Sequence, residues 1–130
     1  MTQDKPFEGR VALVTGASRG IGAATATALA ARGAHVILTA RDDSALERVE
    51  DEIHQSGGTA TIAPVDLTAG DGIARLAQAI ASRWDALDML VICAAYLPTL
   101  TPITQIDPKQ FNTAITTNIL ATQALIAGLH

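Results

Sequence analysis

A glycine-rich turn between an apolar run and an alanine-rich segment constrains this chain more than any other feature. Residues 11–14 read Val-Ala-Leu-Val, and residues 15–22 follow directly as TGASRGIG. A strand that breaks into such a turn and then opens a helix is typical of α/β folds that hold a diphosphate at the helix N-terminus. Gly16 permits the tight turn, Gly20 removes a side chain where backbone approaches phosphate, and Gly22 lets the helix pack closely on the sheet.

The spacing of these glycines narrows the class of nucleotide site. The turn reads G-x-x-x-G-x-G, whereas the commonest dinucleotide loop reads G-x-G-x-x-G. No Gly-Lys-Ser/Thr follows, which excludes a P-loop NTPase. An ordinary strand–turn–helix unit can carry the same glycines, so the interpretation depends on the rest of the chain.

Strand and helix patterns alternate along the whole sequence. Strands are predicted at residues 11–15, 35–39, 59–65 and 87–94, and helices at residues 20–32, 43–55, 71–84 and from 108 to the chain end. The strands are continuous apolar runs rather than alternating ones, as in parallel sheets that are buried on both faces. We therefore expect a doubly wound parallel sheet, a Rossmann fold, in three α/β/α layers.

The number of strands predicts an incomplete domain. The chain has 130 residues, and four strands are little more than one mononucleotide-binding half of a dinucleotide fold. We expect residues 1–130 to be the N-terminal part of a single domain, truncated after the fourth helix.

Composition and charge exclude several classes of function. The net charge of −4 and the lack of a basic stretch argue against nucleic-acid binding. Residues 1–8 are polar, and no apolar run reaches the roughly 18 residues of a membrane helix. One cysteine fits a reducing compartment, so we expect a cytoplasmic protein. His35, His54 and His130 are too scattered to suggest a metal site.

Four features in register resemble the short-chain dehydrogenase/reductase family. Residues 15–22 resemble its TGxxxGxG loop, and Asp66, after the third strand, resembles its adenine-contacting aspartate. Residues 87–91 lead into the place of its NNAG motif, and Asn118 resembles the asparagine of its catalytic tetrad. The resemblance implies an oxidoreductase that transfers hydride between a nicotinamide cofactor and a small carbonyl or alcohol substrate. It also implies a homo-oligomer.

The same resemblance implies roles for individual residues. Asp66 and Leu67 would frame the adenine, Ala94 would lie along the ribose, and Asn118 would support a proton relay. The diphosphate would be held by Gly16, Ser18, Arg19, Gly20, Ile21 and Gly22. The chain departs from NNAG, with Ile92 and Cys93 in place of the asparagines and Ala95 in place of the glycine.

The residues after the second strand favour NADP(H) over NAD(H). NAD-binding members place an acid there for the ribose 2′-hydroxyl, but this chain has Ala40 followed by Arg41. A guanidinium binds a 2′-phosphate well, and Arg19 adds a second cation. The alternative is that Asp42 serves as the ribose acid, with both arginines simply solvated.

Several of these residues also have a structural interpretation. Asp66 could cap a turn, and Asn118 could be a buried polar residue tied to a backbone carbonyl. Cys93 is interpreted as a small buried hydrophobe. Phe111, Ile115, Ile119 and the later leucines are predicted to be core residues, with part of their helix against a partner subunit.

The family's serine and its Tyr-x-x-x-Lys motif have no counterpart in residues 1–130. We expect them in a longer protein, where the tyrosine would act as the acid/base. The alternative function is a catalytically incomplete nucleotide-binding module, if the chain truly ends at residue 130.

Overall fold

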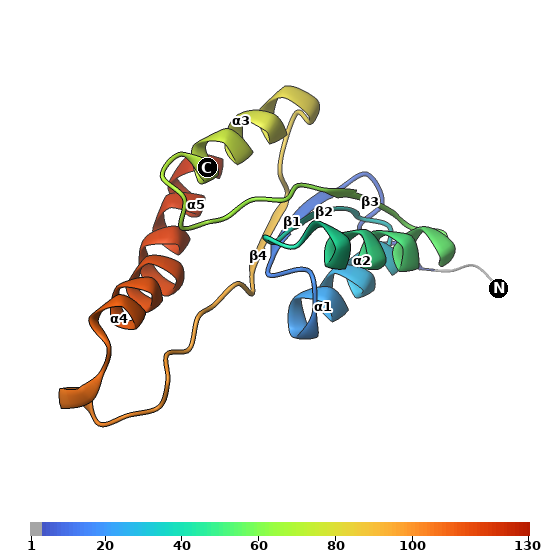
Figure 1. The fold of residues 1–130 in the computed structure, drawn as a ribbon. Helices are drawn as coiled ribbons and strands as arrows, with labels where there is room; N and C mark the ends of the chain where they lie inside the picture. The colour runs from blue at the N-terminus through green and yellow to red at the C-terminus, as the bar shows by residue number, and fades with distance from the viewer. Residues whose placement is uncertain (1–3) are drawn as a thin grey trace.

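A four-stranded parallel sheet lies at the centre of the structure, a computed structural model that describes residues 4–130 (Figure 1). Its order is β3-β2-β1-β4, and the strands are β1 (Val11–Thr15), β2 (His35–Thr39), β3 (Thr59–Ile62) and β4 (Met89–Ile92). After β3 the chain crosses back to place β4 on the other side of β1. This reversal of strand order creates a crevice at the carboxyl ends of the strands, where ligands bind in such folds.

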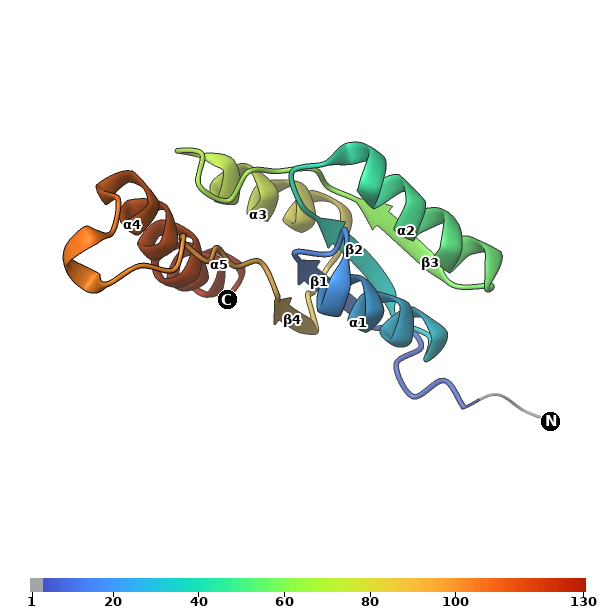
Figure 2. The ribbon, with the colours of Figure 1, turned by 60° about the horizontal axis from the view of Figure 1, so that its bottom comes forward.

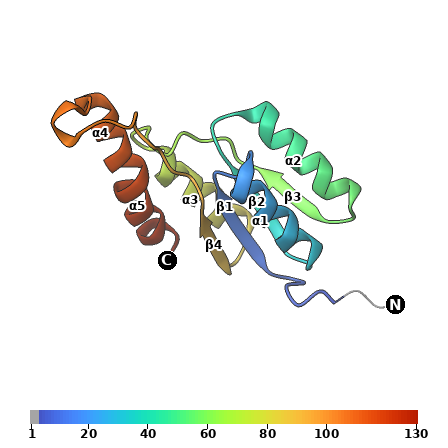
Figure 3. The ribbon, with the colours of Figure 1, turned by 90° about the horizontal axis from the view of Figure 1, so that it is seen from below.

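Helices cover both faces of the sheet, as predicted (Figures 2 and 3). They are α1 (Gly20–Ala31), α2 (Asp43–Gln55), α3 (Gly72–Arg83), α4 (Pro108–Ile115) and α5 (Ala121–Leu129). On one face, Val14 and Leu38 pack beneath α1 and α2, while on the other Leu13 and Ile37 pack beneath α3 and α5. Neighbouring residues of one strand point to opposite faces, so continuous apolar strands fill two cores. The doubly wound three-layer architecture is thus confirmed.

Strand β3 ends earlier than residue 65, and β4 is shorter than residues 87–94. Pro64 follows β3 closely and has no N–H to donate. Pairing with β2 nevertheless continues beyond the strand, because Ala63 N donates to Leu38 O at 2.8 Å and Val65 N donates to Ala40 O at 3.0 Å. The predicted range therefore includes residues that follow the same path without regular strand geometry.

The last predicted helix is interrupted by a π-helical turn. Asp107 caps α4 by accepting a hydrogen bond from Lys109 N at 3.0 Å, and Pro108 occupies the first helical position. The π turn Thr116–Leu120 then separates α4 from α5. Such single-turn insertions often occur at functional sites. Asn118 lies at the centre of this turn.

The prediction that Phe111 and Ile119 are core residues is wrong for the described chain. Their exposed fractions are 43% and 57%. Of the later leucines, Leu120 is 55% exposed and is not a core residue either, whereas Leu125 on α5 is 1% exposed. Figure 1 shows that α4, which carries Phe111, extends beyond the sheet, while α5 lies beside α3. Ile119 belongs to the π turn between these two helices. Within residues 4–130, no helix combines the length and apolar character needed to cross a membrane. Residues 1–3 of the polar N-terminal segment lie outside the described part.

Candidate functional site

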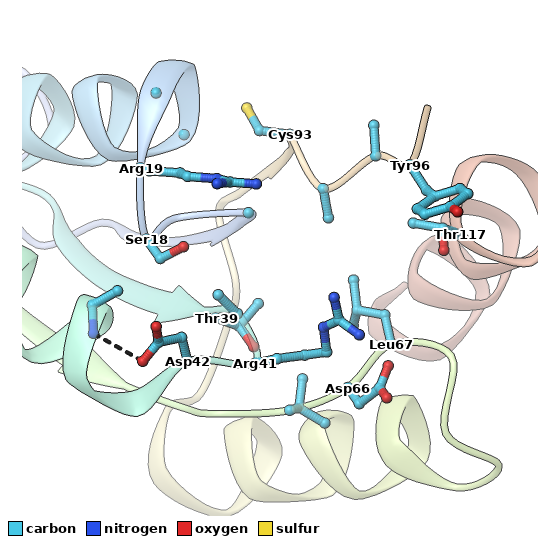
Figure 4. Close-up of a pocket in the computed structure, with 18 of the residues that line it drawn as sticks. Ser18, Arg19, Thr39, Arg41, Asp42, Asp66, Leu67, Cys93, Tyr96 and Thr117 are labelled. Atoms are coloured by element: carbon cyan, nitrogen blue, oxygen red, sulfur yellow. Dashed lines mark hydrogen bonds between the residues drawn. The ribbon is translucent and has the colours of Figure 1, made fainter. Parts of the chain in front are cut away.

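A pocket of about 700 Å³ lies at the carboxyl ends of the strands, where the chain leaves β1, β2 and β4 (Figure 4). It is lined by every residue that the sequence assigned to nucleotide contact: Gly16, Ser18, Arg19, Gly20, Ile21, Gly22, Arg41, Asp66, Leu67 and Ala94. These residues come from the four segments that follow the four strands, the first of which continues into α1, and the parallel sheet brings these segments together at one edge. Asn118 is not among the lining residues, although its neighbour Thr117 is.

The glycine turn has the conformation that its sequence requires. Gly16 has a φ of +64°, and a Cβ there would lie 2.7 Å from Ala94 N, so this position excludes a side chain on two grounds. Gly20 has a φ of +59°, and a Cβ there would meet no protein atom within 4 Å. The space in front of Gly20 is therefore open to a ligand.

The role predicted for Gly22 needs a correction. A Cβ on Gly22 would collide with the carbonyl oxygen of Gly16, so the close approach is between the helix and its own loop rather than the sheet. Arg19 is the N-cap residue of α1 and makes no side-chain capping hydrogen bond. The first N–H groups of α1 thus have no side-chain acceptor from their cap and are available to an anion.

Two buried threonines at strand ends hold the loops in place, and sequence reasoning missed both. Thr15 Oγ1 accepts hydrogen bonds from the N–H groups of Cys93 and Ala94, each at 3.2 Å. Thr39 Oγ1 donates to Ala63 O at 2.6 Å. Both threonines have 0% exposure. A polar residue that ends an otherwise apolar strand was the available signal, because a buried hydroxyl needs a partner.

The two acidic residues of the pocket are both engaged in turns. Asp42, the alternative ribose acid, accepts from Ala45 N at 3.2 Å as the N-cap of α2. Asp66 Oδ1 accepts from Thr68 Oγ1 at 2.6 Å and Thr68 N at 2.9 Å. These hydrogen bonds, with a smaller effect from Arg41, hold the pKa of Asp66 below its usual 3.8. Asp66 therefore has the geometry of the turn-capping interpretation.

Three arginines line the same pocket, one more than the sequence analysis identified. Arg19 and Arg41 are joined by Arg48 from the second turn of α2. The ion pairs among residues 4–130 are Arg10–Asp88 and Arg75–Asp71, so none of the pocket arginines is neutralised by one. The pocket therefore carries an excess of positive charge, although the chain as a whole is acidic.

The far wall of the pocket comes from the segment after β4 and from the last helix. Tyr96 and Thr117 lie next to one another there (Figure 4). Thr113, four residues before Thr117, also lines the pocket. Asn118 is exposed, and its carboxamide is hydrogen-bonded to the backbone of Tyr96. It is thus tied to backbone as the structural interpretation expected, but it is not buried.

Cys93 lines the pocket and is partly exposed, so the interpretation of Cys93 as a small buried hydrophobe is wrong. Ala95, in the place of the motif's glycine, also lines the pocket. Both residues follow β4, where the chain leaves the sheet edge.

Comparison with known proteins shows which proteins this chain resembles. The family model for short chain dehydrogenases matches residues 10–129. A fatty acyl-CoA reductase from Acinetobacter baylyi is 49% identical over 84 residues, which are 65% of this chain and 28% of that protein.

Solved structures match over nearly the whole chain. A metagenomic short-chain oxidoreductase in complex with NADP superposes with a TM-score of 0.92 at 39% identity, covering 95% of this chain and 56% of that one. A short chain dehydrogenase from Shigella flexneri complexed with NADP gives 0.91 at 31% identity, covering 98% and 54%. The chain thus spans about half the length of these structures and a smaller part of the reductase.

Proposed function

The chain belongs to the short-chain dehydrogenase family, and on this basis we propose that it forms the NADP(H)-binding part of an oxidoreductase acting on a small carbonyl or alcohol compound. The observation that carries the proposal is the pocket at the strand ends, which gathers all ten residues assigned to nucleotide contact. Its fit to a dinucleotide rests on the open space at Gly20 and on the α1 N-terminus, which has no side-chain cap.

Each part of the pocket suits one part of the dinucleotide. Gly16, Ser18, Arg19, Gly20, Ile21 and Gly22 hold the diphosphate. Asp66 and Leu67 frame the adenine, with the Asp66 carboxylate oriented by Thr68. Ala94 lies along a ribose, in a backbone position held by Thr15 Oγ1.

The choice of NADP(H) over NAD(H) follows from charge. Ala40 stands where NAD-binding members carry an acid, and the carboxylate of Asp42 already caps α2. Arg41 is exposed, has no ion pair among the described residues, and is free to bind a 2′-phosphate. Two similar solved structures are NADP complexes, which supports the same assignment.

Bound NADP(H) supplies or accepts the hydride at its nicotinamide ring. The residues of this chain bind and orient the two reactants. Asn118 supports the proton relay by holding the segment at Tyr96, and we assign proton transfer itself to a serine and a Tyr-x-x-x-Lys motif outside residues 1–130. The substrate is a small molecule rather than a nucleic acid, in keeping with the net charge of −4.

We assign the protein to the cytoplasm and to a homo-oligomer. The support for an oligomer is the exposed apolar surface of the last helix, where Ile119, Leu120 and Ile126 have exposed fractions of 57%, 55% and 54%. Light scattering tests the homo-oligomer, and a monomeric mass at micromolar concentration would contradict it.

Calorimetric titration with NADPH and NADH tests the cofactor assignment. We expect tighter binding of NADPH, and Arg41→Ala should cost about 1–3 kcal/mol of NADPH binding while leaving NADH nearly unchanged. Arg32→Ala, which removes an exposed arginine outside the pocket, is the matched control. Failure to bind either dinucleotide would overturn the function. Equal losses for both in Arg41→Ala would overturn the role of Arg41.

A further inference from the structure

Arg48 on α2 lines the pocket together with Arg41, although the two residues lie in different elements. Asp42, Ala45 and Arg48 all line the pocket and are spaced three residues apart, which places them on one face of the helix. Side chains on a helix lean toward its N-terminus. Arg48 lines the pocket on the same face as the small side chain of Ala45, and α2 begins at the loop that carries Arg41.

The guanidinium of Arg48 has no ion-pair partner among the described residues. Asp51 and Glu52 follow it at i+3 and i+4, the spacings at which helical ion pairs form. The ion pairs of residues 4–130 nevertheless involve only Arg10 and Arg75. The donors of Arg48 are thus free of carboxylate partners, and they lie at the same pocket as the exposed Arg41.

The carboxylates of Asp42 and Asp66 offset part of this charge, but three arginines against two aspartates leave the pocket with an excess of positive charge. Both carboxylates accept hydrogen bonds within their own turns. Asp42 accepts from Ala45 N, and Asp66 accepts from both the backbone N–H and the hydroxyl of Thr68. A group that carries two negative charges is the ligand that two guanidinium groups would stabilise best.

We propose that Arg48 is a specificity-determining residue, which together with Arg41 clamps the phosphate on the 2′-position of the cofactor ribose. The inference rests on the proposed function and extends it to a residue of α2. The phosphate lies between a guanidinium from the loop after β2 and one from the second turn of the helix. NAD(H) lacks this phosphate, so the clamp favours NADP(H) without contributing to the binding of NAD(H).

Calorimetry on the full protein tests the clamp with four nucleotides. NADPH and 2′,5′-ADP carry the 2′-phosphate, whereas NADH and 5′-AMP do not. Arg48→Gln should raise the Kd of the first two about tenfold and leave the other two within about twofold. The tenfold effect should shrink as salt is raised, because the contact is electrostatic. Arg32→Gln removes an equal charge outside the pocket and should change none of the four.

The double variant Arg41→Gln/Arg48→Gln shows whether the two arginines act on one group. We expect its loss of NADPH affinity to differ from the product of the single losses, since residues that share a partner are coupled. Thermal unfolding of each variant provides the check on folding, because both side chains are exposed and should leave stability nearly unchanged.

The outcomes separate this inference from the function on which it rests. Equal weakening of NADPH and NADH by Arg48→Gln would overturn the clamp, because Arg48 would then contact a part common to both. An unchanged NADPH affinity in Arg48→Gln, with a loss in Arg41→Gln, would overturn the clamp and leave the NADP(H) assignment standing. A wild-type protein that binds none of the four nucleotides would overturn the proposed function itself.

Discussion

The side chain of Asn118 is hydrogen-bonded to both backbone polar groups of Tyr96. Tyr96 N donates to Asn118 Oδ1 at 2.8 Å, and Asn118 Nδ2 donates to Tyr96 O at 2.9 Å. The pair joins the π turn of the last helix to the segment that follows β4. Because Tyr96 and Thr117 line the same pocket, this pair holds its far wall together.

Asn118→Ala should release the segment at Tyr96 while leaving the sheet intact. Removal of the carboxamide leaves the Tyr96 N–H without its acceptor, at a cost of about 1 kcal/mol. The measurement is amide hydrogen exchange, in which the Tyr96 N–H should exchange roughly five- to tenfold faster. Asn112→Ala, at an exposed asparagine of α4 in the same helical segment, is the control and should not change this rate. Unchanged exchange in Asn118→Ala would show that the pair does not hold the segment.

Gly22→Ala should destabilise the protein, because the new methyl group collides with the carbonyl oxygen of Gly16. We expect a loss of about 1–3 kcal/mol in the free energy of unfolding, the usual effect of overpacking. Gly128→Ala is the matched helical control, since its Cβ would lie 3.8 Å from the Cβ of Ala77. It should be neutral or stabilising by about 0.5 kcal/mol. Urea unfolding measures the free energy of unfolding of both variants. Equal values for the two would rule out the collision.

Cys93 offers a direct probe of the pocket, because it is the single cysteine of the chain and is partly exposed there. A bound dinucleotide should shield its thiol from a maleimide reagent. At an NADPH concentration of ten times the Kd, labelling should slow roughly tenfold, in proportion to the free fraction of protein. Mass spectrometry follows the labelling, and Cys93→Ala, which lacks this thiol, is the control for background labelling. Equal rates with and without NADPH would place the nucleotide elsewhere.

His35 should make stability depend on pH. Its ring nitrogens are hydrogen-bonded to Thr59 Oγ1 and Thr61 Oγ1, each at 2.9 Å, and its ring packs against Trp84. Burial, and then the positive charges of Arg83 and His54, lower the pKa of His35 below 6.5. The unfolded chain then binds this proton more readily than the folded one, so stability is complete above pH 6.5 and falls as the pH drops toward the folded-state pKa.

Urea unfolding at about pH 7.5 and about pH 5 measures this effect. His35→Gln should reduce the difference in unfolding free energy between the two pH values, whatever its effect on stability at either one. His130→Gln, at the exposed last residue, is the control for loss of a histidine. The same pH difference in wild type and His35→Gln would contradict the prediction.

Local signals predicted β1, β2 and α2 with the bounds that the structure shows. Each of these elements has an apolar run or period with a clear stop, such as Gly16 after β1 or Ser56 after α2. The ends of β3 and β4 were less predictable, because backbone pairing there depends on the neighbouring strand rather than on the residues themselves. The π turn at Asn118 is a similar case, since the partner of Asn118 lies 22 residues away.

Some residues of the candidate site could likewise be predicted from the sequence, and others could not. The glycine turn and its helix are encoded within a few residues, so their place in the pocket could be predicted. The contributions of Arg48, Tyr96 and Thr117 could not, because their proximity arises only when α2, the segment after β4 and the last helix fold onto one sheet edge. The hydrogen bonds of Asp42 and Asp66 are local instead, because their partners lie two or three residues away, and the turn-capping interpretation of Asp66 could be made from the sequence.

The alternation of apolar strands and helices in this sequence was sufficient to predict its architecture, and together with the glycine turn it predicted the location of the pocket. Both follow from short-range sterics and from the burial of apolar surface, which leave a periodic pattern in the chain. Tertiary structure alone decided which charges of the pocket lack ion-pair partners and which apolar side chains stay exposed. Those properties depend on the distances between side chains that are far apart in the sequence.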